Sequence, residues 1–541
     1  MASVRAATNK IRRPHVMLVS SESAPTKTSG GLSHAVDGLA RALAGLGCRI
    51  SVFLPAHNQT LGMLIRKGSK AGGKIPIETL DDRAINFGDE GRGIEDVWIF
   101  KANIPFSENP SDFITYYFID NARNDMFGNR ELYGYADDAE RYLFFNKAVA
   151  KLIGESQNGE EAGIDPPDVI HCHDWGAAYL GYFLRWNSFG RHIPLVYSIH
   201  NLGYAAKLKP HSFYLATGEK DERIYSWDKG NELYGYMCPI KSMLMHADGI
   251  VPVSETYAEE ILADHFPDGK WNPYAGVLQD PRYQAKLRGI RNGIPDWYGV
   301  DYFFRKNVLP ANYGADNLEG KKASRRHLQK IAGLYPDDRS MIMVNTGRWA
   351  EQKGTDLVQY LLQSGLLRYM NIQFVTVGSE AKGEHYWQRF LHFRDAYPGR
   401  VGVLDFSETY DGPKPNVTLT HENLEALALA GADVLFMPSR FEPCGLAQMY
   451  SLKLGTPAIV RATGGLKDTI EDGVTGFFID QANPASAWRG IQMAYITFKT
   501  QPQIWQAMSI AGIKKDFSWS AVAPRYMDLY EEIIAFWKRQ S

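Results

Sequence analysis

Residues 438–465 place a carboxylate and two glycine-bearing turns where helices are predicted to begin beside a sheet. A buried-type strand is followed by Glu442, and a second short strand ends at Thr463, Gly464 and Gly465. Backbone N–H groups at such helix starts bind phosphate and hydroxyl oxygens. A carboxylate accepts hydrogen bonds from sugar hydroxyls. The combination suits a nucleotide-sugar better than a plain nucleotide.

Cys444 lies between these two elements, and Gly445 and Leu446 follow it at a predicted helix start. Two interpretations of the cysteine stay open. A thiol at a helix start can be reactive, because its pKa is lowered there. A small buried cysteine whose neighbours' backbone amides bind the ligand fits the same residues.

Two cations, Arg348 and Lys353, lie on one predicted loop between the strand SMIMVNT and a helix. Cations at the carboxyl end of a strand can neutralise a diphosphate without a metal ion. A solvated loop with surface charges is the alternative. The presence of Glu442 and the glycine turns in the same half favours the diphosphate.

The first half of the chain carries polar residues at the ends of two further predicted strands. His200 ends the strand PLVYSI, where it can hydrogen-bond a sugar or support developing positive charge through its backbone carbonyl. His171 and His173 share one face of another strand, but no third ligand is evident, so no metal site is predicted. Asp174 and Trp175 are predicted to line the sugar-acceptor side.

A lysine, Lys27, precedes Gly30 and Gly31 at the end of the first predicted strand. Two interpretations of this lysine stay open: it reaches a phosphate, or it is a solvated lysine in a turn. The two glycines open the first predicted helix, and all three residues are candidates for substrate binding.

Several functional classes are excluded by what the sequence lacks. The absence of G-x-G-x-x-G, G-x-x-x-x-G-K-[ST], D-x-D and G-x-S-x-G argues against a dinucleotide cofactor, a P-loop nucleotidase, a metal-held diphosphate and a serine hydrolase. The four cysteines form no C-x-x-C pair, which fits a reducing compartment. A formal net charge of −2 gives no strong attraction to nucleic acid or an anionic membrane. No apolar run approaches the ~20 residues that span a bilayer.

Strand-like and helical runs alternate along the chain and predict an α/β protein with two doubly wound domains. A Rossmann-like acceptor-side domain is predicted over 14–300, a nucleotide-sugar-binding one over 301–518, and an amphipathic helix over 519–541. The basic residues 1–13 lack an apolar core and predict a disordered tail rather than a secretory signal. The polar, glycine-rich segment 67–93 predicts a surface loop or excursion. Predicted strands are 15–21, 49–54, 168–171, 195–200, 249–253, 340–346, 371–377, 401–406 and 432–438.

An ordered set of motifs over nearly the whole chain resembles the bacterial glycogen synthase and plant starch synthase family. The motifs are GGL at 30–32, ELYGYADDAERYLFFNKA at 131–148, HDW at 173–175, SIHNLGY at 198–204, VSETYAEEI at 253–261, RNGI at 291–294, GRWAEQKGTDL at 347–357, PSRFEPCGLAQ at 438–448 and RATGGLKDTI at 461–470. The resemblance implies a GT-B fold, with two Rossmann-like domains facing a central cleft. It also implies transfer of glucose from ADP-glucose to the non-reducing end of an α-1,4-glucan, with retention at the anomeric carbon and without a metal ion.

The resemblance also implies roles for the candidate residues. Arg348 and Lys353 would hold the diphosphate, and Glu442 would bind glucose hydroxyls with help from the amides after Cys444. The Thr-Gly-Gly turn would contact phosphate. His200 would support the sugar near the transition state, with Asn201 beside it. The C-terminal helix would cross back to pack on the first domain.

One departure concerns the family pattern Lys-x-Gly-Gly-Leu. Thr28 stands where the family has its lysine, and Lys27 lies one residue earlier. Side chains one residue apart can point in opposite directions, so Lys27 does not simply replace the missing group. Loss of a cation from a phosphate contact lowers rates by roughly 10²–10³ where other charge-stabilising donors have been removed. His34 is a further candidate for part of this role.

Three hypotheses follow for the function. The first is the ADP-glucose-dependent glucan synthase, with UDP-glucose as the nearest rival donor. The second is a GT-B hexosyltransferase that acts on another acceptor. The third is a catalytically weak glucan-binding or regulatory protein, which the altered lysine motif suggests and the diphosphate clamp argues against. The expected compartment is the bacterial cytoplasm, or a plastid if an N-terminal transit peptide has been removed, and no nucleic-acid or membrane partner is expected.

Overall fold

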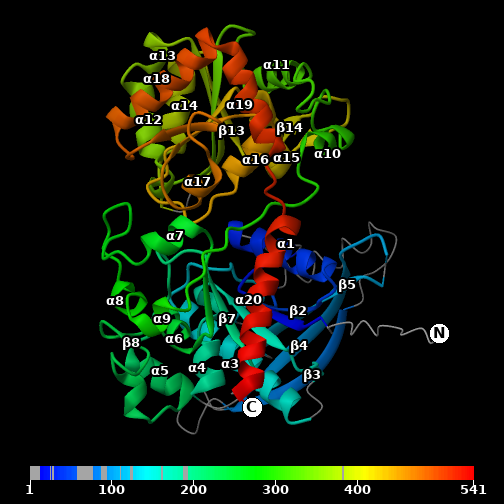
Figure 1. Cartoon of the computed structure of the whole chain (residues 1–541), viewed down its shortest axis with the longest axis vertical. Helices are drawn as coiled ribbons and strands as arrows, with labels where there is room; N and C mark the ends of the chain where they lie inside the picture. The colour runs from blue at the N-terminus through cyan, green and yellow to red at the C-terminus, as the bar shows by residue number, and fades with distance from the viewer. Residues whose placement is uncertain are drawn as a thin grey trace, which may run out of the picture. The chain divides into compact units, whose positions relative to one another are not determined.

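Two compact units make up the chain (Figure 1). Unit 1 comprises Met1–Pro252, Gly276–Arg288 and Ala523–Ser541, and unit 2 comprises Val253–Ala275 and Gly289–Val522. The computed structural model describes residues 13–24, 26, 30–57, 77–86, 94–109, 111–121, 126–159, 163–186, 193–380 and 383–540. The expected disordered tail therefore falls almost wholly outside the described residues.

Unit 1 is built on an eight-stranded sheet in the order β10-β7-β6-β1-β2-β5-β4-β3. Strands from β10 to β5 pair in parallel, whereas β5 with β4 and β4 with β3 pair antiparallel. The central strands are buried along their length, as expected for a parallel sheet covered on both faces. The strands are β1 (His15–Val19), β2 (Arg49–Pro55), β3 (Ile77–Asn86), β4 (Ile94–Pro105), β5 (Phe113–Asn121), β6 (Val169–His173), β7 (Leu195–Ile199) and β10 (Gly249–Pro252), with a hairpin of β8 (Glu232–Leu233) and β9 (Tyr236–Met237).

The antiparallel extension corrects one expectation. Segment 67–93 was predicted to be a surface loop or excursion, yet β3 lies within it and pairs with β4 over most of its length. The strand escaped detection because it is rich in charged residues, which carry no burial pattern. The rest of that segment lies outside the described residues.

Helices of unit 1 follow the strands in the alternation expected of a doubly wound sheet. The first, α1, begins at Gly31 and buries one apolar face that includes Val36, Leu39 and Leu43. The longest before the C-terminus, α3, is almost wholly buried. The helices are α1 (Gly31–Gly45), α3 (Asp138–Gln157), η1 (Trp175–Ala177), α4 (Leu180–Arg185), α5 (Pro210–Thr217), η2 (Glu222–Tyr225), α6 (Pro239–His246) and α9 (Pro281–Gln284), with α8 (Ala275–Leu278) at the unit boundary.

Unit 2 is built on a six-stranded parallel sheet in the order β13-β12-β11-β16-β17-β18. Its strands are β11 (Met341–Trp349), β12 (Ile372–Glu380), β13 (Val401–Asp405), β16 (Val434–Met437), β17 (Ala458–Arg461) and β18 (Gly476–Ile479), beside a hairpin of β14 (Tyr410–Asp411) and β15 (Thr418–Leu419). Its helices are α7 (Glu255–Glu260), α10 (Val300–Arg305), α11 (Lys321–Ile331), η3 (Glu351–Lys353), α12 (Thr355–Gln363), α13 (Leu366–Tyr369), α14 (Trp387–Ala396), α15 (His421–Gly431), α16 (Ala447–Lys453), α17 (Gly464–Thr469), α18 (Pro484–Thr500) and α19 (Pro502–Lys514). Both sheets confirm the α/β class predicted from the sequence.

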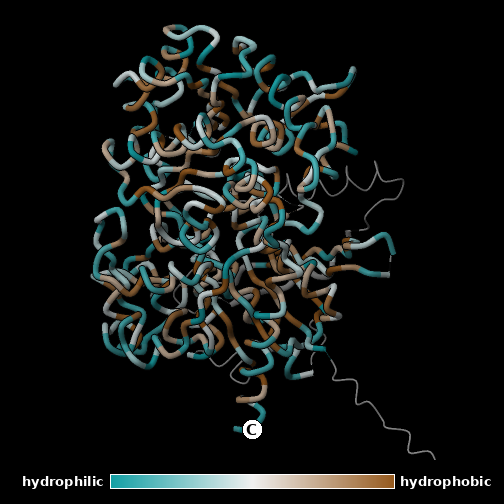
Figure 2. Tube along the Cα trace, turned by 45° about the horizontal axis from the view of Figure 1, so that its top comes forward, coloured by the Kyte–Doolittle hydropathy of each residue, from teal (hydrophilic) through white to brown (hydrophobic). Residues whose placement is uncertain are grey.

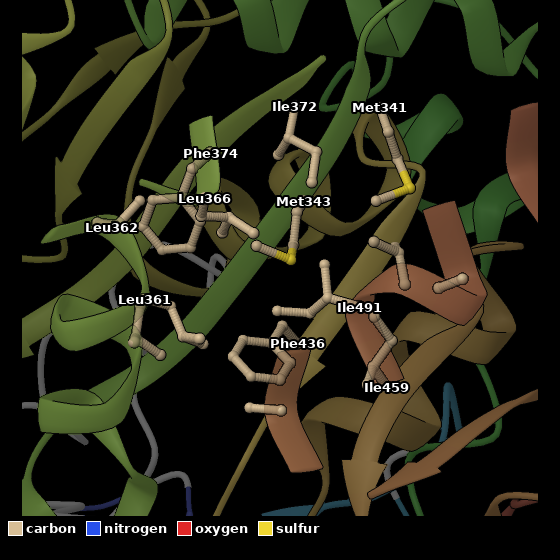
Figure 3. Close-up of a cluster of buried hydrophobic side chains, with 14 of the residues drawn as sticks. Met341, Met343, Leu361, Leu362, Leu366, Ile372, Phe374, Phe436, Ile459 and Ile491 are labelled. Carbon is tan, nitrogen blue, oxygen red and sulfur yellow. The ribbon is translucent and has the colours of Figure 1, made fainter. Parts of the chain in front are cut away.

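The core of unit 2 fills one face of this sheet. Met343, Phe374 and Phe436 project from three neighbouring strands and meet helix residues such as Leu362 and Ile491 (Figure 3). Hydrophobic and hydrophilic stretches alternate along the chain, and many of the outermost turns of the trace are hydrophilic (Figure 2). Because side chains alternate along a strand, every second residue of β11 faces this core, and the residues between them face the opposite side of the sheet.

The C-terminal helix α20 (Trp519–Gln540) starts in unit 2 and continues in unit 1, as predicted. In unit 1 its Tyr530 hydroxyl lies 2.7 Å from His171 Nδ1. A Cβ added to Gly249 would lie 2.8 Å from the Ile533 side chain, so β10 and α20 pack closely. Residues 253–275, which the predicted boundary at 300 assigned to the first domain, group with unit 2. In the part of the chain that the structure describes, no helix combines the length and apolar character needed to span a bilayer.

Core packing of unit 2 gives a stability prediction. Phe374 is fully buried, so Phe374→Ala should lower the free energy of unfolding by about 3–5 kcal/mol. Tyr369→Ala removes an aromatic ring that is 78% exposed and should change it by no more than about 0.5 kcal/mol. Scanning calorimetry of both variants checks this, and equal shifts would contradict the packing described.

Candidate functional site

The strand order of unit 2 locates its ligand position. The chain runs outward from β11 to β13 and then resumes on the other side of β11 with β16. Open α/β sheets bind ligands outside the carboxyl ends of the two strands at such a switch point. Here those ends carry Arg348 on β11 and the segment after Met437 on β16.

An ion pair joins the loops that follow these two strands. Lys353, at the end of η3, donates through Nζ to Glu442 Oε2 at 2.6 Å, and Ser439 Oγ donates to the same oxygen at 3.1 Å. The Glu442 side chain is 7% exposed and that of Lys353 is 24% exposed. Burying a carboxylate this deeply costs stability unless such partners meet it. Arg348 is exposed on β11, on the sheet face opposite to buried Trp349.

Close backbone packing holds the two loops together. Gly354 has φ of 71°, and a Cβ there would lie 2.5 Å from the Pro438 carbonyl oxygen. The backbone N–H of Arg440 donates to the Gln352 carbonyl at 2.8 Å, and its guanidinium makes two hydrogen bonds with the Asp356 carboxylate. The sequence therefore needs glycine at 354 for Lys353 to reach Glu442.

The Thr-Gly-Gly turn lies against Glu442, as its sequence position suggested. A Cβ on Gly464 would lie 2.0 Å from the Glu442 carbonyl oxygen, which also accepts the N–H of Gly465 at 3.1 Å. The Thr463 hydroxyl and the Gly464 N–H both donate to Glu260 Oε1, at 2.8 and 3.0 Å. Groups predicted to contact phosphate thus already have protein partners. Sequence reasoning missed Glu260, which lies on α7 far away in the chain.

Cys444 is buried, and burial raises the pKa of its thiol to about 12. A thiol with such a pKa is not a thiolate nucleophile near neutral pH, which supports the interpretation as a small buried residue. Gly445 and Leu446 precede α16, and Gln448 Nε2 donates to the carbonyls of Cys444 and Gly445, each at 3.1 Å.

In unit 1 the predicted residues gather at the carboxyl ends of β6 and β7. His173 Nδ1 lies 3.1 Å from His200 Nε2. Burial lowers the pKa of His200 to about 3 and also lowers that of His173, so both rings are neutral near pH 7. His171 lies 2.8 Å from the Ser198 hydroxyl through Nε2 and so serves packing. Among the described residues, no group of three or more His, Cys, Asp and Glu side chains is arranged to hold a metal ion.

Asp174 follows β6 in a strained backbone conformation, with φ of 59°. Its carboxylate accepts the Trp175 N–H at 3.0 Å and a backbone hydrogen bond from Asn201. Burial raises its pKa to about 7, and the negative charge of Glu22 adds to this. Strain and a shifted pKa together mark Asp174 as a functional candidate. Trp175, which was also expected to line the acceptor side, is instead buried against the Tyr142 ring, because its indole completes an aromatic cluster.

Gly30 caps the start of α1, where the Ser33 hydroxyl donates to its carbonyl at 2.9 Å, and Gly31 is the first helical residue. Lys27 and Thr28, on which the departure from the family pattern rests, lie outside the described residues. Asn201 Oδ1 accepts the Gly203 N–H at 2.8 Å, which forms a tight turn after β7.

The two doubly wound units have the architecture of the GT-B class of glycosyltransferases, and the comparisons with known proteins assign the chain to that class. Residues 15–273 match the starch synthase catalytic domain, and 414–497 match glycosyl transferases group 1. The chain is 32% identical to glycogen synthases of Moorella thermoacetica, with 96% of each chain covered, and of Geobacillus thermodenitrificans, with 96% of this chain and 98% of that one covered. The chain belongs to the glycogen synthase and starch synthase family.

A solved structure agrees with this assignment of the fold. The catalytic domain of starch synthase IV from Arabidopsis thaliana, bound to ADP and acarbose, superimposes with a TM-score of 0.79. It is 23% identical, and the match covers 97% of this chain and all of that one. The GT-B fold predicted from the sequence is therefore confirmed.

The raised pKa of Asp174 gives a prediction about pH. The carboxyl is protonated below about pH 7 and ionised above it. The ionised form is the stronger hydrogen-bond acceptor, so the KM for a glucan acceptor should fall as pH rises through about 7. Asp174→Asn should remove this inflection in initial-rate profiles. An unchanged inflection in that variant would assign the titration to another group.

Proposed function

We propose that this protein is a retaining α-1,4-glucan synthase that transfers glucose from ADP-glucose to the non-reducing end of an α-1,4-glucan. The observation that carries the proposal is the 2.6 Å pair of Lys353 and Glu442 at the switch point of unit 2, where β11 also carries Arg348. Membership of the family supports the reaction class, and glycogen synthases are its full-length relatives.

In this proposal Arg348 and Lys353 stabilise the negative charge that develops on the departing nucleoside diphosphate. The bond from the anomeric carbon to the diphosphate oxygen breaks, and a bond to the acceptor hydroxyl oxygen forms on the same face. The acceptor's proton leaves with the diphosphate. Preorganised cations at such a position stabilise the transition state more than the ground state.

Glu442 would accept hydrogen bonds from glucose hydroxyls. Because its partner Lys353 would also contact phosphate, the pair would couple recognition of the sugar to that of the leaving group. The backbone groups of Cys444, Gly445 and Leu446 and of the Thr-Gly-Gly turn would contribute further contacts. For the turn, this requires Glu260 to yield its hydrogen bonds to Thr463 and Gly464.

Unit 1 would serve the sugars with uncharged groups. His200 is neutral near pH 7, so it would act by hydrogen bonding and through its backbone carbonyl rather than as a general acid. Asn201 would lie beside it, and Asp174 would hold an acceptor hydroxyl. Lys27, Gly30 and Gly31 would complete the binding residues.

No metal ion is required by the proposed reaction, because two side-chain cations take its place at the diphosphate. The substrates are then a nucleotide-sugar and an α-glucan such as maltooligosaccharide, glycogen or starch. We place the enzyme in the bacterial cytoplasm, since its relatives at 32% identity include bacterial glycogen synthases. Nucleic acid and membrane are not among its proposed partners.

The test is an elongation assay with maltooligosaccharide as acceptor and ADP-glucose or UDP-glucose as donor. The released nucleoside diphosphate and the length of the glucan chains are measured. Lys353→Ala and Glu442→Ala should each lower turnover by 10²-fold or more. Each single variant also leaves a buried charge unpaired. The double variant removes both charges, so it should regain stability and remain inactive.

Lys322→Ala with Glu319→Ala serves as a matched control, because it removes an exposed ion pair from the same unit. The control should keep wild-type turnover. Recovery of turnover in the Lys353/Glu442 double variant would reduce the pair to a structural role. No elongation by the folded wild type with either donor would overturn the proposed reaction.

A further inference from the structure

A second carboxylate lies near the switch point of unit 2, outside every motif used so far. Glu425 lies on α15, and its carboxylate accepts a 2.8 Å hydrogen bond from the hydroxyl of Thr346 on β11. Its exposure is intermediate. Burial raises the pKa of Glu425, while the Thr346 hydrogen bond lowers it. The group is therefore a partly exposed carboxyl that is held by one hydrogen bond from Thr346.

The register of β11 relates this carboxylate to the proposed diphosphate cations. Thr346 and Arg348 are two residues apart and share a face of the strand, opposite to Trp349. Two strand residues span roughly 7 Å. The charge of Lys353 also acts on Glu425. Glu425 thus contacts β11 two residues before Arg348, on the face that Arg348 shares, and within range of the Lys353 charge.

Aromatic residues form the surroundings of Glu425. The rings of Tyr298 and Tyr450 stack with centroids 4.2 Å apart, and the Glu425 charge helps to raise the pKa of both phenols. Glu422, one turn earlier on the same helix, adds a further negative charge. Among the described residues Lys353 is the cation whose charge acts on Glu425, and Lys353 is already paired with Glu442.

A purely structural role does not account for the unused hydrogen-bond acceptor positions of the Glu425 carboxylate. Over the described ranges, the hydroxyl of Thr346 is the one hydrogen-bond donor found for this carboxylate. An ionised carboxylate has about four acceptor positions. The remaining capacity suits a ligand with neutral hydroxyl donors, because another anion would be repelled.

We infer that Glu425 accepts hydrogen bonds from the ribose hydroxyls of the donor nucleotide. The inference rests on the proposed function, since it takes the diphosphate to lie at Arg348 and Lys353. In dinucleotide-binding sheets an acidic residue holds the ribose hydroxyls in the same way. Glu425 is then a specificity-determining residue for ribose. Thr346 is a positioning residue that fixes the carboxylate.

The experiment compares equilibrium binding of ADP, 2′-deoxy-ADP and 3′-deoxy-ADP by isothermal titration calorimetry. A hydrogen bond to a charged group should make the wild type prefer ADP over at least one deoxy analogue by about tenfold or more. Glu425→Ala should bind ADP and that analogue equally. Glu425→Gln keeps the size of the side chain and a neutral hydrogen-bond acceptor, so the preference of this variant for ADP over the analogue should fall to a few-fold. Thr346→Val should give an intermediate preference, because the carboxylate loses its anchor.

Glu422→Gln is the matched control, since it removes the same charge from the same helix. It should change the affinity for ADP and for the analogues by one common factor and leave their ratio unchanged. If Glu425→Ala does not fold, Glu425→Gln carries the test, with its thermal unfolding curve as the check on structure.

The outcomes separate the inference from the proposed function. If Glu425→Ala still prefers ADP, or if Glu425→Gln prefers ADP as strongly as the wild type does, the inferred role of Glu425 is wrong. The proposed function is not affected by that result. A wild type that binds ADP and both analogues equally also overturns the role of Glu425 and leaves the proposed function intact. A folded wild type that binds neither ADP nor UDP overturns both.

Discussion

The ion pair of Lys353 and Glu442 is the interaction on which the structure of unit 2 depends at its switch point. A carboxylate buried this deeply is costly unless a cation and further donors meet it. The sequence meets this requirement by ending two adjacent parallel strands in loops that touch, which requires glycine at 354. In the proposed function each member of the pair takes one further partner, a sugar hydroxyl at Glu442 and a phosphate at Lys353.

The two units contribute different chemistry. Unit 2 gathers charged groups at its switch point, where Lys353 pairs with Glu442. Unit 1 gathers neutral hydrogen-bonding groups, since burial keeps His173 and His200 uncharged. Only Asp174 titrates near pH 7 among these groups, and its strained backbone shows that the fold maintains its position at a cost. A glycosyl transfer needs both kinds of group, because its leaving group is an anion and its sugars are neutral.

Much of this architecture follows from sequence patterns. Continuous apolar runs predicted the parallel strands, and their carboxyl ends predicted where His200, Arg348 and Glu442 would lie. The antiparallel strand β3 was missed because its charged residues carry no burial period. Glu260 and Glu425 were missed because each meets its partner only through tertiary packing, and nothing local distinguishes them from solvated helix carboxylates. Burial of Trp175 likewise depends on rings contributed by a distant helix.

The most direct measurement is a crystal structure of the protein with bound ADP-glucose. The account predicts the diphosphate in contact with Lys353 and Arg348, and glucose hydroxyls within hydrogen-bond distance of Glu442. A nucleotide-sugar bound away from the carboxyl ends of β11 and β16 would contradict it. So would a complex in which the Lys353–Glu442 pair stays intact and touches neither phosphate nor sugar.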